Sequence, residues 1–291
     1  MHQYQHQSKL SNTSLSEEKS YWDKKYDIFE AEYYRFMDRY VNLQEMLEST
    51  NGVIYTAESL KDQGQVIMKK IWRDRVATFH EVPDGRECPN EIWYHMKALE
   101  ASPKLVAPLL DWFEFEDFYL VVLPKIPKSC DLFQLLSQNG PLAESRAKKI
   151  FKQLVKVCHD LQKHGICHRD IKDENILVDK QDNIYLIDFG TTMDYDSSYS
   201  DQVGTECFFS PEYFDRGFFR PEELTVWSLG AVLYMLLVRC WRFKDQTWHR
   251  RHADESHLSK NAINLIDRVL NPVPEDRAKL VQIISSDWLN C

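Results

Sequence analysis

Short apolar runs dominate the first part of the chain, and their length and alternation predict strands. One run with helical spacing interrupts them, NEIWYHMKALE at residues 90–100. The strand-like runs are VNLQEML (41–47), GVIYTAE (52–58), QVIMKKI (65–71) and FYLVVL (118–123).

After residue 130 the runs become longer and the pattern becomes helical. They are DLFQLLSQ (131–138), ESRAKKIFKQLVKVCHDLQKHG (144–165), TVWSLGAVLYMLLV (225–238) and NAINLIDRVL (261–270). The pattern predicts an α+β protein with a small β-rich N-lobe over residues 40–124 and a larger α-helical C-lobe over residues 125–291.

The first 39 residues differ from the rest. Residues 1–19 are polar, which predicts a disordered tail. An amphipathic helix is expected over 20–39, because aromatic residues recur at helical spacing: Trp22, Tyr26, Phe29, Tyr33 and Phe36. We expect this helix to pack on the lobe that follows, since two heptads are too few for an independent coiled coil. A partner-binding helix is the alternative.

Two adjacent lysines, Lys69 and Lys70, lie in the third strand-like run. Strand alternation places Ile67, Lys69 and Ile71 on one face. Lys69 is therefore predicted to point inward among apolar neighbours, and Lys70 outward.

Charged residues gather in the segment CHRDIKDENILVDKQDNIYLIDFG, at residues 167–190. His168-Arg169-Asp170 and Asn175 match H-R-D-x-x-x-x-N, and Asp188-Phe189-Gly190 follows a short strand. With VIMK upstream and a glutamate in the helix that follows it, the chain resembles the eukaryotic protein kinases. The resemblance implies a bilobal protein kinase fold that uses ATP and Mg²⁺.

Phosphoryl transfer needs positioning and charge neutralisation more than covalent help. By resemblance, Asp170 accepts the proton of the substrate hydroxyl and Lys172 contacts the transferred phosphate. Asn175 and Asp188 are the implied Mg²⁺ ligands, which suits a cation that prefers oxygen.

Nucleotide binding is likewise assigned by resemblance. Lys69 pairs with Glu91, Leu123 is the gatekeeper, the carbonyl of Pro124 accepts from adenine, and the N–H of Ile126 donates. The other implied nucleotide contacts are Leu47, Gly52, Ile54, Ile67, Leu177 and Asp188.

Further motifs extend the resemblance from residue 40 to residue 290. Gly204-Thr205 and Ser210-Pro211-Glu212 close the activation segment, and Arg277 is expected to pair with Glu212. The phrases LLDWFE, HRDIKDENIL and LIDFG are similar to the PIM family of Ser/Thr kinases. The helix reads TVWSLG, and Thr225 stands where most kinases have Asp, a departure that PIM kinases share.

The chain departs from the family pattern in its phosphate loop. The stretch Leu47-Glu48-Ser49-Thr50-Asn51-Gly52 keeps only the last of three glycines. Ile67 replaces a small Ala under the adenine ring, and His95 lies where the regulatory stack usually has an apolar residue. We expect weakened or altered ATP binding, and a buried, neutral histidine is the simplest structural explanation of His95.

Substrates are expected to be proteins with Ser/Thr acceptors, with basic sequences as one option. Asp131, Glu174 and Thr205 are the implied substrate contacts, and Asp173 belongs to the same acidic set. In the activation segment, phosphate on Ser197, Ser198, Tyr199 or Ser200 could pair with Arg169; the equal alternative is a loop that needs no modification.

The acidic balance, a net charge of −9, argues against non-specific binding to nucleic acid. Seven scattered cysteines suggest reduced thiols, hence a cytoplasmic or nuclear protein. The N-terminal MHQYQHQSKL lacks the apolar core of a signal peptide, and VWSLGAVLYMLLV is too short to span a bilayer. We expect a monomer that does not bind membranes.

Two alternatives remain open beside an active Ser/Thr kinase. One is a pseudokinase, a scaffold of the same fold that acts by protein–protein binding. The other, ranked last because GTECFFSPE resembles a peptide-docking segment, is a small-molecule kinase of related fold.

Overall fold

The computed structural model describes residues 27–49, 52–195, 198–200, 204–238, 243–244, 247–248 and 254–291. The predicted tail over 1–19 and the first part of the predicted helix, up to residue 26, lie outside the described residues. The chain forms two compact units. Unit 1 combines residues up to 76 with 110–123, and unit 2 combines 77–109 with 124–291.

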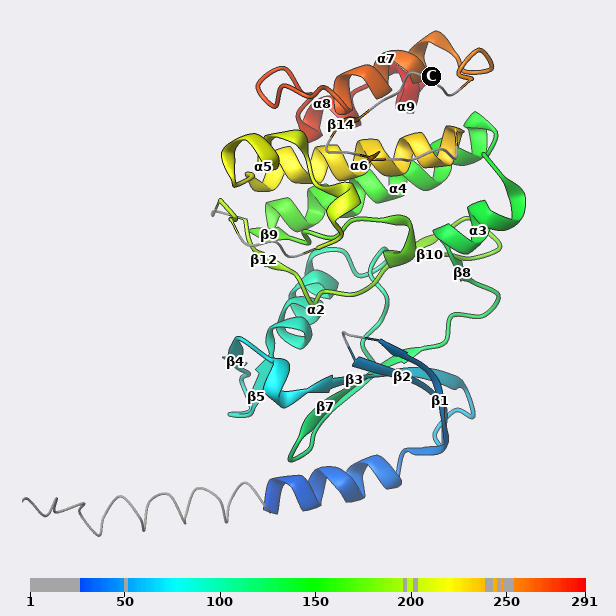
Figure 1. The fold of residues 1–291 in the computed structure, drawn as a ribbon. Coiled ribbons are helices and arrows are strands. Elements are labelled where there is room, and N and C mark those ends of the chain that lie inside the picture. Colours follow the sequence, from blue (N-terminus) through cyan, green and yellow to red (C-terminus); the bar gives the residue numbers. More distant parts are fainter. Residues whose placement is uncertain are drawn as a thin grey trace, which may run out of the picture. The chain divides into compact units, whose positions relative to one another are not determined.

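Unit 1 is built on a five-stranded sheet in the order β1-β2-β3-β7-β6 (Figure 1). Its strands are β1 (Tyr40–Ser49), β2 (Gly52–Ser59), β3 (Gln65–Trp72), β6 (Asp111–Glu114) and β7 (Phe118–Pro124). A 3₁₀ turn, η1 (Arg73–Arg75), follows β3. Alternating residues of β2 and β3 form the core of this unit, and the strands therefore have the predicted period of two.

A helix over residues 27–37 packs on the same unit. Phe36 lies edge-on to Phe113, with ring centroids 5.4 Å apart, and also contacts Tyr40. Arg35 donates to the Asp111 carboxylate at 2.6 Å, and its guanidinium lies over the Phe113 ring. The helix thus docks on unit 1, as expected. Tyr33, however, was predicted on the packed face together with Phe36, and it is 51% exposed.

Unit 2 is mainly helical. Its helices are α2 (Asn90–Ala101), α3 (Leu132–Asn139), α4 (Glu144–Lys163), α5 (Pro211–Arg216), α6 (Pro221–Val238), α7 (Lys260–Val269), α8 (Leu280–Ile284) and α9 (Asp287–Asn290). Short strands connect them: β4 (Phe79–Glu81), β5 (Glu87–Pro89), β8 (Cys130–Asp131), β9 (Ile166–Cys167), β10 (Ile176–Val178), β11 (Ile184–Leu186), β12 (Met193–Asp194), β13 (Phe243–Lys244) and β14 (Thr247–Trp248). Two 3₁₀ turns complete it, η2 (Asp173–Asn175) and η3 (Glu206–Phe208).

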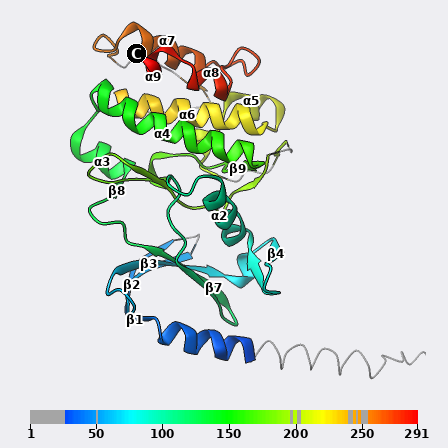
Figure 2. The same cartoon turned by 180° about the vertical axis from the view of Figure 1, so that it is seen from behind.

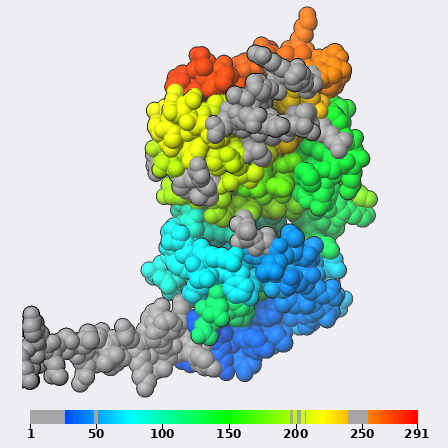
Figure 3. Space-filling view, viewed as in Figure 1, coloured from blue at the N-terminus to red at the C-terminus, as the bar shows by residue number. Residues whose placement is uncertain are grey.

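Helices α4 and α6 lie side by side at the centre of unit 2 (Figures 1 and 2). Helix α6 begins at Pro221 and is long and apolar enough to cross a membrane, so the prediction that this segment is too short to do so is wrong. The prediction of a buried core helix is confirmed, because 78% of it is buried inside the protein. Gly230 lets α7 approach, because a Cβ there would lie 2.7 Å from Leu270. The C-terminal segment lies directly on the α5–α6 region (Figure 3).

Residues 77–109, including α2, belong with the helical unit. The sequence prediction placed them in the N-lobe of residues 40–124. Tyr94 and Ala98 of α2 are buried in the main core of unit 2, which accounts for this grouping.

Candidate active site

The catalytic loop begins at the end of β9, directly after Cys167. His168 is buried, its Nε2 lies 3.1 Å from the carbonyl of Ile187, and its Nδ1 accepts from the main chain of Asp170 at 3.3 Å. Burial lowers the pKa of His168, so the ring is neutral and makes one hydrogen bond through each of its nitrogens. It ties the loop to the strand that leads to Asp188.

Asp170 lies at the centre of a network within unit 2. Asn175 donates to both the carbonyl and the Oδ2 of Asp170, each at 2.9 Å. The other oxygen, Oδ1, accepts from the main chain and the hydroxyl of Thr205 at 3.1 and 2.9 Å. The carboxylate is therefore held in one orientation from both sides.

Lys172 lies beside the same carboxylate. Its Nζ is 3.0 Å from Asp170 Oδ2, 3.3 Å from Glu174 and 2.8 Å from Thr205 Oγ1. Burial by itself would lower the pKa of Lys172, but the two carboxylates outweigh it and raise the pKa. Lys172 is thus a cation at physiological pH, placed beside the predicted base.

Gly204 brings the activation segment onto the catalytic loop. Its φ is +111°, and a Cβ on it would lie 3.0 Å from the carbonyl of Arg169. This close approach requires glycine and places the neighbouring Thr205 against Asp170. Thr205, predicted as a substrate contact, is therefore also part of the Asp170 network.

The predicted metal ligands, Asn175 and Asp188, lie at the same end of a hairpin of two short strands. β10 pairs antiparallel with β11, and the main chain of Ile187 donates to the carbonyl of Asn175 at 3.1 Å. This pairing brings Asp188, the next residue, beside Asn175. Asp188 has a φ of +62°, and its Oδ1 accepts from the main chain of Gly190.

These two residues fit a magnesium ion. Asn175 uses its Nδ2 on Asp170, and within the described part of the chain its Oδ1 has no hydrogen-bond donor. The same described ranges contain no cluster of three or more His, Cys, Asp or Glu that could hold a metal. Two oxygen ligands are what Mg²⁺ uses when phosphates and water complete its shell.

The carboxylate of Glu91, a residue of α2, lies near that of Asp188. A Cβ built on Gly190 would lie 3.2 Å from both Glu91 Oε2 and Asp188 Oδ1. Two carboxylates that flank one glycine repel each other unless cations lie near them. Such a pair is consistent with the predicted lysine and metal partners.

Phe189 is fully buried between two histidine rings, those of His95 and His168, at 4.9 and 5.0 Å. His95 Nε2 lies 2.7 Å from the carbonyl of Ala107, so this buried histidine is hydrogen-bonded. The prediction that His95 is buried is confirmed.

In unit 1, three predicted nucleotide contacts form one row across the sheet. Leu47 pairs with Ile54, and Ile54 pairs with Lys69. Directly opposed residues of antiparallel strands share a face, and Ile67 shares it with Lys69. Leu47 is 60% exposed. The gatekeeper Leu123 belongs to this unit and is half-buried in β7.

Lys70 lies on the opposite face, which contains Met68 and Val66 of the unit 1 core. Its Nζ lies 3.7 Å from the ring centroid of Trp72 and 4.1 Å from that of Phe118. The predicted division of the two lysines between faces is confirmed. The prediction that Lys70 points outward is wrong, because it packs on aromatic rings.

The sheet itself requires a glycine at position 52. Its φ is +137°, and a Cβ there would lie only 2.1 Å from the carbonyl of Lys70 in β3. The β2–β3 pairing therefore requires glycine at this position. Its role as a phosphate contact stays a prediction.

The remaining predicted contacts lie in unit 2. The carbonyl of Ile126 accepts from Ser129, while its N–H has no partner among the residues that the structure describes. Pro124 ends β7, and Leu177 pairs with Asp131 and Tyr185. The free N–H is compatible with the predicted adenine contact.

Two of the predicted acidic substrate contacts have structural partners. Asp131 caps α3 by accepting from the main chain of Gln134 at 2.7 Å. Glu174 is exposed beside Lys172. Asp173 is only 8% exposed, and burial together with Glu174 raises its pKa to about 6. Asp173 is therefore a buried residue of the loop.

The predicted structural pair is present. Glu212 and Arg277 form two hydrogen bonds of 2.7 Å, and both side chains are buried. In the activation segment, Arg169 is buried with its guanidinium 4.3 Å from the centroid of the Tyr199 ring. Ser198 and Ser200 are exposed, and Ser197 lies outside the described residues.

Two residues of α2 that the sequence analysis did not single out contact the activation segment. Asn90 donates to the carbonyl of Thr192 at 2.8 Å, and Tyr94 donates to Asp194 at 2.9 Å. Their spacing of four residues on a predicted helix, beside Glu91, was the available signal.

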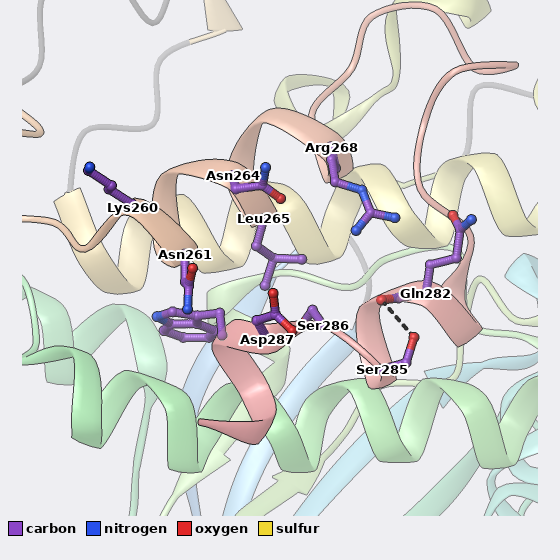
Figure 4. Close-up of a pocket in the computed structure, with 10 residues that line it drawn as sticks. Lys260, Asn261, Asn264, Leu265, Arg268, Gln282, Ser285, Ser286 and Asp287 are labelled. Carbon is purple, nitrogen blue, oxygen red and sulfur yellow. Dashed lines mark hydrogen bonds between the residues drawn. The ribbon is translucent and has the colours of Figure 1, made fainter.

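A separate hollow of about 350 Å³ lies among the C-terminal helices (Figure 4). Lys260, Asn264 and Arg268 of α7 line one side, and Gln282 of α8 and Ser285, which directly follows that helix, line another. It contains none of the predicted reaction residues.

Comparison with known proteins agrees with this geometry. The model of the family "Protein kinase domain" matches residues 40–289. The chain is 34% identical to the serine/threonine-protein kinase pim-2 of Danio rerio over 250 residues. This match covers 82% of the present chain and 80% of pim-2. These matches confirm the predicted fold class and the resemblance to the PIM group.

Other relatives are longer than this chain. The serine/threonine-protein kinase prk-2 of Caenorhabditis elegans is 30% identical, over 88% of this chain and 59% of that protein. PSK2 of Saccharomyces cerevisiae, also a serine/threonine-protein kinase, is 30% identical over 85% of this chain and 23% of its own length.

Proposed function

Since this chain belongs to the protein kinase family, we propose that it is an active serine/threonine kinase that transfers the γ-phosphoryl group of ATP to protein substrates. The observation that carries the proposal is the network around Asp170. A carboxylate held by Asn175 and Thr205, with Lys172 beside it, is arranged for a hydroxyl acceptor and an anionic phosphoryl group.

Each side chain has a separate task. Asp170 accepts the proton of the substrate hydroxyl, and Lys172 binds the phosphoryl oxygens. Asn175 and Asp188 would hold Mg²⁺, which neutralises phosphate charge when bound. Lys69, with Glu91, is expected to bind the nucleotide. Thr205 orients Asp170 and Lys172 through its hydroxyl.

The nucleotide is expected to bind weakly. Gly52 is explained by strand pairing, and the loop before it offers side chains where the family has glycines. Leu47, Ile54, Ile67, Leu123 and Leu177 supply apolar contacts in the proposal, and Pro124 and Ile126 supply the adenine hydrogen bonds. Low affinity for ATP, rather than loss of catalysis, follows from these substitutions.

Substrates are proposed to be Ser/Thr-containing proteins, with basic residues read by Glu174 and Asp131. Both carboxylates already have a partner, since Asp131 caps a helix and Glu174 lies 3.3 Å from Lys172, but that of Glu174 is exposed. We further propose a reduced intracellular compartment, cytoplasmic or nuclear, and a monomer that binds neither nucleic acid nor membranes.

The test is phosphorylation of an oriented peptide library with Mg²⁺-ATP, compared with Asp188→Asn. Phosphate on Ser/Thr peptides that is absent in the variant is the expected result. Transfer no higher than in the variant rejects the proposal. Thermal stabilisation by Mg²⁺-ATP separates the alternatives, because a pseudokinase scaffold that binds no nucleotide would show none.

A further inference from the structure

Two hydrogen bonds attach helix α2 to the segment that follows Asp188. Asn90 and Tyr94 lie four residues apart and so share one face of the helix. Asn90 Nδ2 donates to the carbonyl of Thr192 at 2.8 Å, and Tyr94 Oη donates to Asp194 Oδ1 at 2.9 Å. Both acceptors are within β12 or directly before it.

Segment β12 is itself fixed to the catalytic loop. Met193 pairs with Cys167 and Asp194 with Ile166, so β12 forms a small sheet with β9. The main chain of Tyr195 donates to the carbonyl of Gly165 at 2.8 Å. Because β9 leads directly into His168, the two bonds from α2 end on the framework that holds Asp170.

Neighbouring groups orient both donors. His80 Nε2 lies 2.9 Å from Asn90 Oδ1, which directs the amide nitrogen of Asn90 toward Thr192. Tyr94 is 4% exposed, and burial together with Asp194 raises its pKa. The hydroxyl therefore keeps its proton and acts as a donor to the carboxylate.

The far end of α2 is anchored separately. Ser102, which follows the helix, donates to Asp160 of α4 at 2.7 Å. The bonds of Asn90 and Tyr94 hold the near end, where Glu91 extends toward Gly190 and Asp188. Loss of these bonds would remove the side-chain contacts that join this end of the helix to Thr192 and Asp194.

We propose that Asn90 and Tyr94 are positioning residues that fix Glu91 for nucleotide binding by attaching α2 to Thr192 and Asp194. This inference rests on the proposed kinase function, since it concerns the helix that carries Glu91. The attachment joins two side-chain donors of α2 to the main-chain carbonyl of Thr192 and the carboxylate of Asp194.

The test compares Tyr94→Phe, Asp194→Ala and Asp194→Asn by hydrogen–deuterium exchange. Tyr94→Phe and Asp194→Ala each remove one side of the bond. Exchange in both 90–97 and 192–195 should rise about tenfold, because each variant removes the hydrogen bond that joins the two segments. Asp194→Asn keeps an acceptor oxygen and should behave like the parent.

Kinetics give a second readout. The KM for ATP should rise about fivefold in Tyr94→Phe and Asp194→Ala, with kcat changed less than twofold, because the nucleotide contact weakens while Asp170 stays in place. A purely structural loss would lower the active fraction and leave the KM unchanged. The KM for ATP of the double variant, Tyr94→Phe with Asp194→Ala, should be no higher than that of either single variant.

Tyr185→Phe is the matched control, because Tyr185 donates to Asp179 elsewhere in unit 2. It should leave exchange in α2 and the KM as in the parent. Exchange in Tyr94→Phe within twofold of the parent would overturn the inference, and Asp194→Ala decides it if that variant does not fold. A parent that transfers no phosphate overturns the proposed function instead, and exchange still tests the attachment.

Discussion

Asn175 donates two hydrogen bonds to Asp170, one to its carbonyl and one to its Oδ2, each 2.9 Å long. The same amide therefore orients the predicted base and leaves its own oxygen for a cation. We expect Asn175→Ala to lower kcat on the order of 100-fold, because both tasks fail together.

Steady-state kinetics over a range of Mg²⁺ concentrations check this prediction. The variant should also need more Mg²⁺ for half-maximal rate. Asn183→Ala is the control, since Asn183 donates to Asp179 outside the site. A kcat for Asn175→Ala close to that of the parent would contradict the assigned role.

Replacing Lys69 or Lys70 by alanine should have opposite effects on stability and on ATP binding. Lys70→Ala loses the contact with Trp72 and Phe118, and we expect a loss of about 1 kcal/mol of stability with little change in the KM for ATP. Lys69→Ala should retain stability and lose nucleotide binding. Chemical denaturation and ATP titration of both variants check the prediction; weaker ATP binding in Lys70→Ala alone would reverse the assignment.

The buried pair of Glu212 and Arg277 should contribute strongly to stability. Arg277→Ala leaves a buried carboxylate unpaired, and we expect a loss of about 3–5 kcal/mol. The exposed pair of Arg216 and Glu275 has the same 2.7 Å separation, and Arg216→Ala should cost less than about 1 kcal/mol. Urea unfolding of both variants measures the difference, and equal losses would refute the role of burial.

The raised pKa of Asp173 predicts that the free energy of unfolding depends on pH. Its pKa is about 6 in the folded chain against an ordinary 3.8, so the folded state binds the proton more tightly than the unfolded state. Ionisation therefore lowers stability as pH rises from about 4 to 6, by up to about 3 kcal/mol.

Asp173→Asn removes that penalty. The variant should gain stability relative to the parent at pH 8 and gain little at pH 4. Urea unfolding at both values measures the difference. A gain that is equal at the two pH values would show that Asp173 titrates normally.

Local patterns in the sequence predicted much of the site. The period of two along β3 placed Lys69 and Lys70 on opposite faces, because alternation is a property of the strand itself. The spacing of Asp170, Lys172 and Asn175 predicted their grouping, since all three lie in one loop. Asp188 joins them through the β10–β11 hairpin, which a short connection makes possible.

Contacts between distant residues could not be predicted in this way. Tyr94 and Asp194 are one hundred positions apart, and no local period links them. Alternation alone predicted that Lys70 points outward, and it could not reveal the contact with Phe118, which lies on another strand. The grouping of α2 with the helical unit likewise depends on its packing in the core of that unit, which one sequence does not reveal.

The most direct test of the central claim is the rate of Mg²⁺-dependent phosphoryl transfer from ATP to a Ser/Thr peptide by the parent and by Asp170→Asn. The parent should transfer phosphate, and the variant, folded and still able to bind ATP, should be slower by at least about 100-fold. Equal rates for the two proteins, or a parent that transfers none, would contradict the account.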